Sequence, residues 1–185
     1  MIYTIGYAGV DIDRFVKILK DNNITLLIDV RSLPKSRYFY QFNDTSLCKV
    51  LGANAIEYQN WKLEFGARQQ NLEFFTDGIL DYNKFAQSKQ FINGIKKIKA
   101  LTQKGQIICL MCAEIDPLIC HRAILCGKEL FAGGLDVTHI IAKRNGETIL
   151  ESQTDFETRL QLQTKVNNLV EAYQKQNKKI GYKLT

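Results

Sequence analysis

The sequence predicts an α/β fold: a three-layer sandwich with a mostly parallel central sheet, helices on both faces, a C-terminal edge hairpin and a long terminal helix. Short apolar runs, typical of strands buried on both faces, alternate along the chain with stretches of helical period. Elements in this order form parallel strand pairs joined by right-handed crossovers. The dipeptide Asn145-Gly146 is a strong turn signal and predicts the antiparallel hairpin.

The first sixty residues are predicted to contain three strands and two helices. Gly6 and Gly9 flank a turn after the first strand, and Asp11 or Asp13 then starts a helix that ends near Asn22. The strands are expected at residues 1–5, 25–30 and 56–58, and the second helix at residues 44–51.

The same alternation continues in the second half of the chain. A helical period covers residues 82–103, with an expected break near Gln90. The run Thr154-Asp155-Phe156-Glu157 is a capping box that predicts the start of the long terminal helix. Further strands are expected at residues 107–111, 135–141 and 148–150.

Residues 61–81 have the weakest pattern in the chain. Trp61, Glu64, Gly66 and Arg68 follow neither a helical nor a strand period. A loop of this length in a compact domain is often a lid or a binding loop. We therefore expect an insertion or lid here, with an unplaced helix as the alternative.

The chain is predicted to form a single domain over residues 1–185. Its length and its 45% hydrophobic content suit one core of ordinary size. No window holds about 18 consecutive apolar residues, which argues against a membrane-spanning helix. The first residues have no signal-peptide pattern, so we expect a soluble cytoplasmic protein without a membrane partner.

The cysteines indicate the redox environment of the protein, and the net charge bears on its binding partners. Five cysteines without regular spacing do not form a disulfide framework, so reduced thiols are expected. Cys48 shares a helical face with Leu47 and Leu51 and is expected to be structural. The net charge of +6 comes partly from a basic tail at residues 175–185, and a solvated tail is weak evidence for nucleic-acid binding.

Residues 110–122, LMCAEIDPLICHR, carry the densest group of reactive side chains. The loop at residues 112–115 follows a buried strand, where open α/β sheets bind ligands. Asp116 is a good N-cap and Pro117 suits a first helical turn, so a helix is expected from residue 117 to about residue 131. A helix N-terminus favours anions and thiolates. The candidate catalytic residues are Cys112, Glu114, Cys120 and His121. In the alternative interpretation, Cys120 is a core residue on one helical face with Ile124, Gly127 and Phe131.

Charged side chains follow the second predicted strand. Asp29 and Arg31 lie at its carboxyl end, which in a parallel sheet is the same edge as the loop at residues 112–115. The candidate substrate-binding residues are Asp29, Arg31, Arg37 and Arg122. The arginines would clamp a phosphate or carboxylate while Glu114 or Asp29 moves a proton. A structural ion pair between Asp29 and Arg122 is the alternative.

Basic and aromatic side chains are interleaved in the loop at residues 32–42. Lys35 and Arg37 are followed by Tyr38 and Tyr40. This pattern grips phosphates and stacks on bases in nucleic-acid-binding proteins. The alternative is that the aromatic side chains cover the core beneath a long loop.

Five ordered motifs resemble those of an uncharacterised family, the domain of unknown function 488. The segment CAEIDPLICHR, residues 112–122, is similar to the family signature C-A-E-x-x-P-x-x-C-H-R. The other similar segments are TIGYAG (residues 4–9), IDVRSLPKSR (28–37), QFN (41–43) and THI (138–140). The family brings no settled activity, so the resemblance indicates which residues matter and not what they do.

No cofactor or metal is predicted. Cys112 and Cys120 lack the C-x-x-C spacing of zinc sites, and helical side chains at Cys120 and His121 would point about 100° apart. A divalent ion held by Asp29, Glu114 and Asp116 suits the charges, but Asp116 already has an N-cap role. Both metal sites are therefore minor alternatives.

A thiol nucleophile is another alternative. Cys112 at a strand end, with the D-V-R sequence after an early strand, resembles rhodaneses and cysteine phosphatases. Those enzymes use a short anion loop, whereas Arg122 comes ten residues after Cys112 and the carboxylates of Glu114 and Asp116 would repel phosphate. A rhodanese-like thiol-dependent transferase is therefore an analogy.

Together the charges favour a hydrolase or transferase that acts on an anionic, phosphate-containing substrate such as a nucleotide or nucleic acid. The main alternative is a non-catalytic nucleic-acid-binding module. Convergence of the candidate residues on one pocket would favour catalysis. An exposed basic face, with Cys112 and Glu114 occluded, would favour binding.

Overall fold

Buried apolar strands and amphipathic helices alternate along the chain in the computed structural model, which describes residues 1–184. Thr185, the last residue of the predicted basic tail, lies outside the described residues. The strands are β1 (Ile2–Gly6), β2 (Leu26–Asp29), β3 (Glu57–Asn60), β4 (Phe75–Thr76), β5 (Ile79–Leu80), β6 (Ile108–Cys112), β7 (Val137–Ala142) and β8 (Thr148–Ser152). The α-helices are α1 (Ile12–Asp21), α2 (Asp44–Gly52), α3 (Lys62–Phe65), α4 (Tyr82–Ala86), α5 (Lys89–Gln103), α6 (Lys128–Ala132), α7 (Gln153–Thr164) and α8 (Leu169–Ile180).

Six strands form one sheet in the order β3-β2-β6-β1-β7-β8. All neighbouring strands are parallel except β7 and β8, which form the predicted edge hairpin. The chain runs outward from β1 through β2 to β3 and then returns through β6 to β7, so β6 lies between β2 and β1. The strand order reverses there, and the carboxyl ends of these three strands form the crevice in which open α/β sheets bind ligands.

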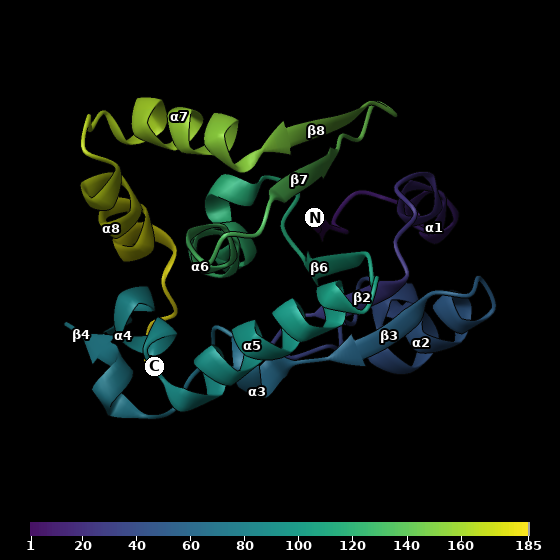
Figure 1. Cartoon of the computed structure of the whole chain (residues 1–185), viewed down its shortest axis with the longest axis horizontal. Helices are drawn as coiled ribbons and strands as arrows, with labels where there is room; N and C mark the ends of the chain where they lie inside the picture. The colour runs from purple at the N-terminus through teal and green to yellow at the C-terminus, as the bar shows by residue number, and fades with distance from the viewer. Residues whose placement is uncertain (185) are drawn as a thin grey trace.

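Helices cover both faces of the sheet, as predicted. Helices α1 and α2 bury Phe15 and Leu47 against one face. Helices α5, α6 and α7 bury Ile98, Leu130 and Phe156 in the cluster on the other face. Figure 1 shows α1 and α2 together on one side of the strands and α6 and α8 on the other. The two apolar clusters thus enclose the sheet in three layers.

The helical stretch at residues 82–103 is divided, as expected, close to Gln90. Helix α4 ends at Ala86, and Ser88 caps α5 because its hydroxyl oxygen accepts a hydrogen bond from the Phe91 backbone N–H at 3.2 Å. A serine that accepts such a bond satisfies a free donor at the helix start.

The terminal helical stretch is divided as well. Lys165 has a positive φ of 56° and ends α7, and Asn168 caps α8. Helix α7 begins earlier than predicted because Ser152, and not Thr154, is its N-cap, accepting from the Asp155 backbone N–H at 3.1 Å. Cys48, which was expected to be structural on the helical face of Leu47 and Leu51, is instead exposed at the surface of α2.

Residues 61–81 contain α3 and the short β4–β5 hairpin, and they bury Phe65 and Phe75 in the core. The chain end packs on this region: Lys183 pairs with Ile79, and the Leu184 N–H donates to the Gly78 carbonyl oxygen at 3.2 Å. Figure 1 shows the C-terminus next to β4 and α4.

Among residues 1–184, none of the helices combines the length and apolar character needed to cross a membrane.

Candidate active site

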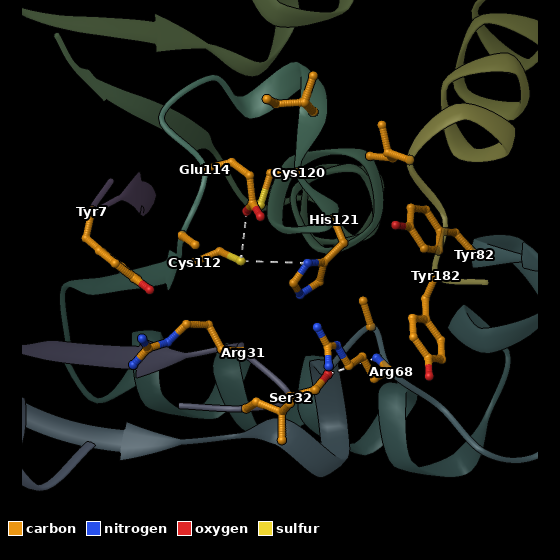
Figure 2. A pocket seen from close by; sticks show the side chains of 15 residues that line it. Tyr7, Arg31, Ser32, Arg68, Tyr82, Cys112, Glu114, Cys120, His121 and Tyr182 are labelled. Atoms are coloured by element: carbon orange, nitrogen blue, oxygen red, sulfur yellow. Dashed lines mark hydrogen bonds between the residues drawn. The ribbon is translucent and has the colours of Figure 1, made fainter. Parts of the chain in front are cut away.

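A cavity of about 280 Å³ opens at the carboxyl ends of β1, β2 and β6. Its walls come from segments far apart in the sequence, because Tyr7 follows β1, Arg31 follows β2 and Cys112 ends β6 (Figure 2). The cavity is also lined by the other predicted catalytic residues, Glu114, Cys120 and His121. The four predicted catalytic side chains and one predicted substrate-binding side chain therefore meet in one place.

The loop after β6 is fixed by a close backbone approach and by one buried arginine. Gly6 pairs with Cys112 in the parallel register, and a Cβ atom at Gly6 would lie 1.7 Å from the Glu114 carbonyl oxygen. Arg122 is fully buried and donates to the carbonyl oxygens of Glu114 at 2.5 Å and Ile115 at 3.0 Å. Arg122 thus positions the loop, and the alternative of an Asp29–Arg122 ion pair is wrong.

The helix predicted from residue 117 to about residue 131 ends close to the predicted residue, but it begins only after Cys120. Asp116 is a cap, as expected, but only a 3₁₀ turn, Pro117–Ile119, follows it. Cys120 is then extended, with φ −133° and ψ 135°, and a π-helix, Arg122–Gly127, precedes α6. Because Cys120 is extended and His121 helical, their side chains are not 100° apart on one helix, and both reach the cavity. Cys120 is therefore not on one helical face with Ile124, Gly127 and Phe131, but it is buried in the core cluster while it also lines the cavity. π-Helical turns frequently occur at functional sites.

Cys112, Glu114 and His121 form a connected group (Figure 2). The Sγ atom of Cys112 lies 3.2 Å from Oε2 of Glu114 and 3.8 Å from Nδ1 of His121. Nε2 of His121 lies 3.1 Å from the Val30 carbonyl oxygen. A carbonyl oxygen only accepts, so Nε2 carries a proton, and in the neutral ring Nδ1 presents its lone pair to Cys112.

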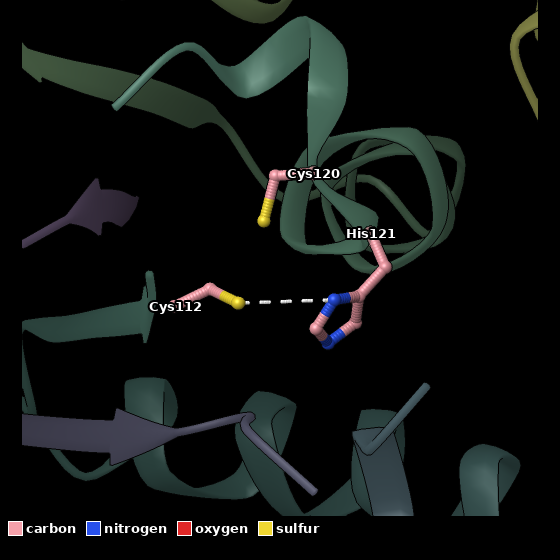
Figure 3. Close-up of side chains that lie close together, drawn as sticks. All are labelled: Cys112, Cys120 and His121. Atoms are coloured by element: carbon pink, nitrogen blue, oxygen red, sulfur yellow. Dashed lines mark hydrogen bonds between the residues drawn. The ribbon is translucent and has the colours of Figure 1, made fainter. Parts of the chain in front are cut away.

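The second thiol lies against the same group. Figure 3 shows Cys120 and His121 at the start of the helical segment, facing Cys112 at the end of its strand. The two Sγ atoms and a ring nitrogen of His121 all lie within 4.8 Å of one another. Cys112 and Cys120 are 4% and 1% exposed, so the group is shielded from bulk water except through the cavity.

Burial and mutual contacts shift the pKa values of the two thiols in opposite directions. The hydrogen bond with Cys120, followed by burial, raises the pKa of Cys112 well above its ordinary value. Burial opposes ionisation of Cys120, but the Cys112 hydrogen bond, the Arg122 charge and His121 together hold its pKa well below the ordinary value. Burial also raises the pKa of Glu114. The metal-free group therefore favours one negative charge shared by two thiols.

Asp29 and Arg31 form a buried ion pair at the edge of the cavity. Arg31 donates to Asp29 through Nε at 2.8 Å and Nη2 at 2.6 Å, and Tyr58 donates to the same carboxylate at 2.8 Å. Nη2 of Arg31 also donates to the Phe42 carbonyl oxygen, whereas its buried Nη1 has no hydrogen-bond partner among the described residues. Asp29 is thus used structurally, and Arg31 keeps one free donor.

Two features of the site were not predicted from the sequence. Arg68, from the pattern-poor stretch at residues 61–81, lines the cavity, and its guanidinium lies 5.8 Å from the centre of the Tyr182 ring. A second cavity of about 610 Å³ shares Ser32, Leu33, Arg68 and Tyr182 with the first. Its other polar lining residues are Lys62, Gln69, Gln70, Asn71 and Gln90. Apart from Gln90, these lining residues follow neither a helical nor a strand period, so only the folded chain shows that they line a cavity.

Other predicted residues lie elsewhere. Arg37 is exposed and does not line the cavity. Asp116 caps the 3₁₀ turn and forms an ion pair with Arg159 at 3.0 Å. The predicted carboxylate set of Asp29, Glu114 and Asp116 is not brought together, and within residues 1–184 the one group with metal-ligand geometry is the Cys112, Cys120 and His121 set.

Comparison with known proteins identifies the family of this chain. A family model described as a domain of unknown function, DUF488, matches residues 11–128, well over half of the chain. The chain belongs to this family. The DUF488 match includes the segments at residues 28–37, 41–43 and 112–122, which supply Arg31 and all four predicted catalytic residues. None of the curated proteins and none of the solved structures matches the chain.

The arrangement found in this DUF488 protein can support two chemistries. The two thiols beside His121, with the lowered pKa of Cys120, suit a cysteine nucleophile whose thiol proton the imidazole takes. The convergence of two thiols and one imidazole instead suits a soft metal ion. In both cases Glu114 is placed to hold a proton beside the reactive group, and Arg31 and Arg68 are placed to hold an anion there.

Proposed function

We propose that this DUF488 protein is an enzyme, a hydrolase or transferase, that acts on an anionic, phosphate-containing substrate in the cavity at the carboxyl ends of β1, β2 and β6. The observation that carries this proposal is the convergence of Cys112, Glu114, Cys120 and His121 with Arg31 and Arg68 on one cavity. Reactive groups and unsatisfied cationic donors in one partly enclosed site are typical of active sites.

Two arginines supply the attraction for an anion. Arg68 makes no salt bridge within residues 1–184, and its guanidinium is presented at the cavity wall (Figure 2). Nη1 of Arg31 is a buried donor that has no hydrogen-bond partner among residues 1–184. A buried donor costs free energy until an acceptor reaches it, so an oxyanion within reach of Nη1 would be stabilised.

The adjoining cavity bears on the size of the substrate. Its about 610 Å³ adds to the about 280 Å³ of the reactive cavity, and Arg68 lies between the two. Amide side chains can both donate to and accept from a base or sugar. We therefore infer a nucleotide-sized substrate, with its phosphate near Arg68 and its polar remainder among the glutamines. Free thiols persist in the reducing cytoplasm, and we infer that compartment for the reaction.

A ligand screen with two arginine variants tests this proposal. Calorimetric binding of a panel of phosphomonoesters, nucleotides and matched uncharged nucleosides should reveal a ligand that requires its phosphate. Arg68→Ala should weaken that binding at least about tenfold, since charged hydrogen bonds contribute about 1.5–3 kcal/mol. Arg37→Ala, an exposed arginine outside the cavity, is the matched control and should leave it unchanged. Equal effects of the two variants, or no phosphate-dependent ligand, would refute the proposal.

A non-catalytic nucleic-acid-binding role is the second candidate, and one observation favours it. Tyr38 and Tyr40 are 89% and 72% exposed, although the neighbouring Phe39 packs on Tyr7 at 5.7 Å between ring centres. Exposed aromatic side chains beside basic residues are suited to stack on unpaired bases. Lys35 is exposed in the same loop. A role of this kind would use the loop and not the cavity.

A further inference from the structure

The predicted catalytic cysteines and histidine have the geometry of a metal site. We propose that Cys112, Cys120 and His121 bind one zinc ion, whose remaining coordination position faces the cavity. The catalytic purpose of this ion rests on the proposed function, but its binding does not. The site takes a soft divalent cation, for which two thiolates and one imidazole are preferred ligands.

The distances between the ligand atoms agree with a tetrahedral ion. Zinc bonds of about 2.3 Å to sulfur and about 2.0–2.1 Å to nitrogen place neighbouring ligand atoms roughly 3.4–3.8 Å apart. Sγ of Cys112 lies 3.8 Å from Nδ1 of His121, and all three ligand atoms lie within 4.8 Å of one another. Only small side-chain rotations are therefore needed to complete the site (Figure 3).

The histidine is oriented as a metal ligand. Nε2 of His121 donates to the Val30 carbonyl oxygen at 3.1 Å, which turns the Nδ1 lone pair toward the two thiols. Metal-binding histidines almost always donate their second ring N–H to a carbonyl or carboxylate in this way, and the bond fixes the tautomer. The Val30 carbonyl group, directly after β2, thus orients the His121 ring toward an ion bound between Cys112 at the end of β6 and Cys120.

The backbone supports the same assignment. Sequence spacing disfavoured zinc because Cys120 and His121 are adjacent, but the extended backbone at Cys120 lets both side chains reach one point. Arg122 anchors the opposite side of the site through the Glu114 and Ile115 carbonyl oxygens. The ligands are therefore held by a rigid frame, which lowers the cost of binding.

The site has three protein ligands and one open side. Glu114 reaches Cys112 at 3.2 Å but is not part of the convergent group of three, so it stays available to hold a proton. All three ligands line the cavity, as expected for a catalytic zinc ion that keeps a position for water or substrate. Two thiolates and Zn²⁺ sum to zero charge, which removes the cost of burying thiolates alone.

The test measures metal binding directly and needs no substrate. Purified wild-type protein, stripped with a chelator, should bind one Zn²⁺ per chain in competition with a fluorescent chelator. Co²⁺ should give thiolate charge-transfer absorption that Zn²⁺ abolishes. Cys120→Ser and His121→Gln should each weaken Zn²⁺ binding by more than the roughly 10–100-fold that loss of a supporting hydrogen bond costs. Cys126→Ser removes a buried cysteine outside the group and is the matched control.

Each outcome decides the proposal. Failure of the folded wild-type protein to bind Zn²⁺, or a Co²⁺ spectrum without thiolate bands, would overturn it and leave the free-thiol chemistry. Equal Zn²⁺ affinity in wild type and Cys120→Ser would also overturn it, because the ion would then be adventitious. Zinc binding without a phosphate-dependent ligand would retain the metal site and refute the proposed function. Binding of a phosphate-dependent ligand by a protein that does not bind Zn²⁺ would retain the proposed function and refute the metal site.

Discussion

Gly6 lies so close to the loop after β6 that a Cβ atom on it would be 1.7 Å from the Glu114 carbonyl oxygen. The contact joins the end of β1 to the segment that carries the reactive side chains, and Tyr7 N–H donates to the Cys112 carbonyl oxygen beside it. The same Glu114 carbonyl accepts from Arg122. The position of Glu114 therefore depends on the absence of a side chain at residue 6.

Gly6→Ala should displace the loop and destabilise the protein. Overpacking costs typically 1–3 kcal/mol, and a clash with backbone should reach about 3 kcal/mol, because backbone relaxes less than a side chain. Urea unfolding measures the loss, and zinc or ligand binding should weaken with it. Gly52→Ala is the control: no heavy atom among residues 1–184 lies within 4 Å of the added carbon in α2, so stability should be unchanged or slightly higher. Equal unfolding midpoints for the two variants would contradict the close approach.

Arg31→Ala should be strongly destabilising because it leaves the fully buried Asp29 carboxylate without its cation. Removing one partner of a buried ion pair typically costs about 3–5 kcal/mol. In a double-mutant cycle, adding Asp29→Asn to Arg31→Ala should cost less than the sum of the single changes. Arg37→Ala, at the surface, should stay within about 0.5 kcal/mol of wild type. Additive losses from Asp29→Asn and Arg31→Ala would mean that the pair is not coupled.

The sheet and the edge that holds the site could be predicted because both depend on local pattern. Asp29 and Arg31 follow one buried apolar run and Cys112 and Glu114 follow another, and parallel strands place their carboxyl ends at one edge. The resemblance also indicated the family, which the DUF488 match confirms.

The internal geometry of the site could not be predicted, because tertiary contacts override the local pattern there. Residues 117–131 have a cap, a first-turn proline and an apolar period, all of which favour one helix, yet Cys120 is extended. The buried guanidinium of Arg122 hydrogen-bonds two carbonyl groups of the preceding loop, and sequence spacing does not encode such a contact. Arg68 was not predicted to line the site because residues 61–81 have no helical or strand period from which the direction of its side chain could be inferred.

The cavity-lining thiols should react before the other buried thiols in metal-free protein. Cys112 and Cys120 line the cavity, and the pKa of Cys120 is held well below its ordinary value, whereas burial raises the pKa of Cys109 and of Cys126. Cys48 is exposed, so the experiment requires a Cys48→Ser background. Iodoacetamide labelling near pH 7, followed by peptide mass spectrometry, should modify Cys112 or Cys120 first, and Zn²⁺ should protect both. Equally slow labelling of all four cysteines would place Cys112 and Cys120 in an inaccessible core.

His139 should make the protein less stable in acid. Its ring is fully buried between Thr4 (2.8 Å) and Gln153 (3.0 Å), and burial lowers its pKa to about 3 from an ordinary 6.5. Between these values the unfolded chain binds a proton that the folded chain does not, so stability falls as the pH drops from about 6.5 toward 3. From pH 7 to pH 4 this contributes about 3 kcal/mol. His139→Gln should flatten the curve of unfolding free energy against pH by that amount, and parallel curves would contradict the depressed pKa.

Salt dependence separates nucleic-acid binding by the exposed loop from small-molecule binding in the cavity. Each phosphate neutralised by Lys35 or Arg37 should add about −0.7 to −0.9 to the slope of log affinity against log salt. If the loop binds oligonucleotides, Arg37→Ala should flatten that slope by one such step, while Tyr38→Ala should lower affinity without changing it. Arg68→Ala, in the cavity, is the matched comparison. Fluorescence anisotropy with a single-stranded oligonucleotide from 50 to 200 mM salt, roughly the range over which such contacts weaken binding strongly, provides the measurement. Undetectable or salt-insensitive binding by the wild type would eliminate the loop as a nucleic-acid site, and the enzyme that acts on a small phosphate-containing substrate would then be the better hypothesis.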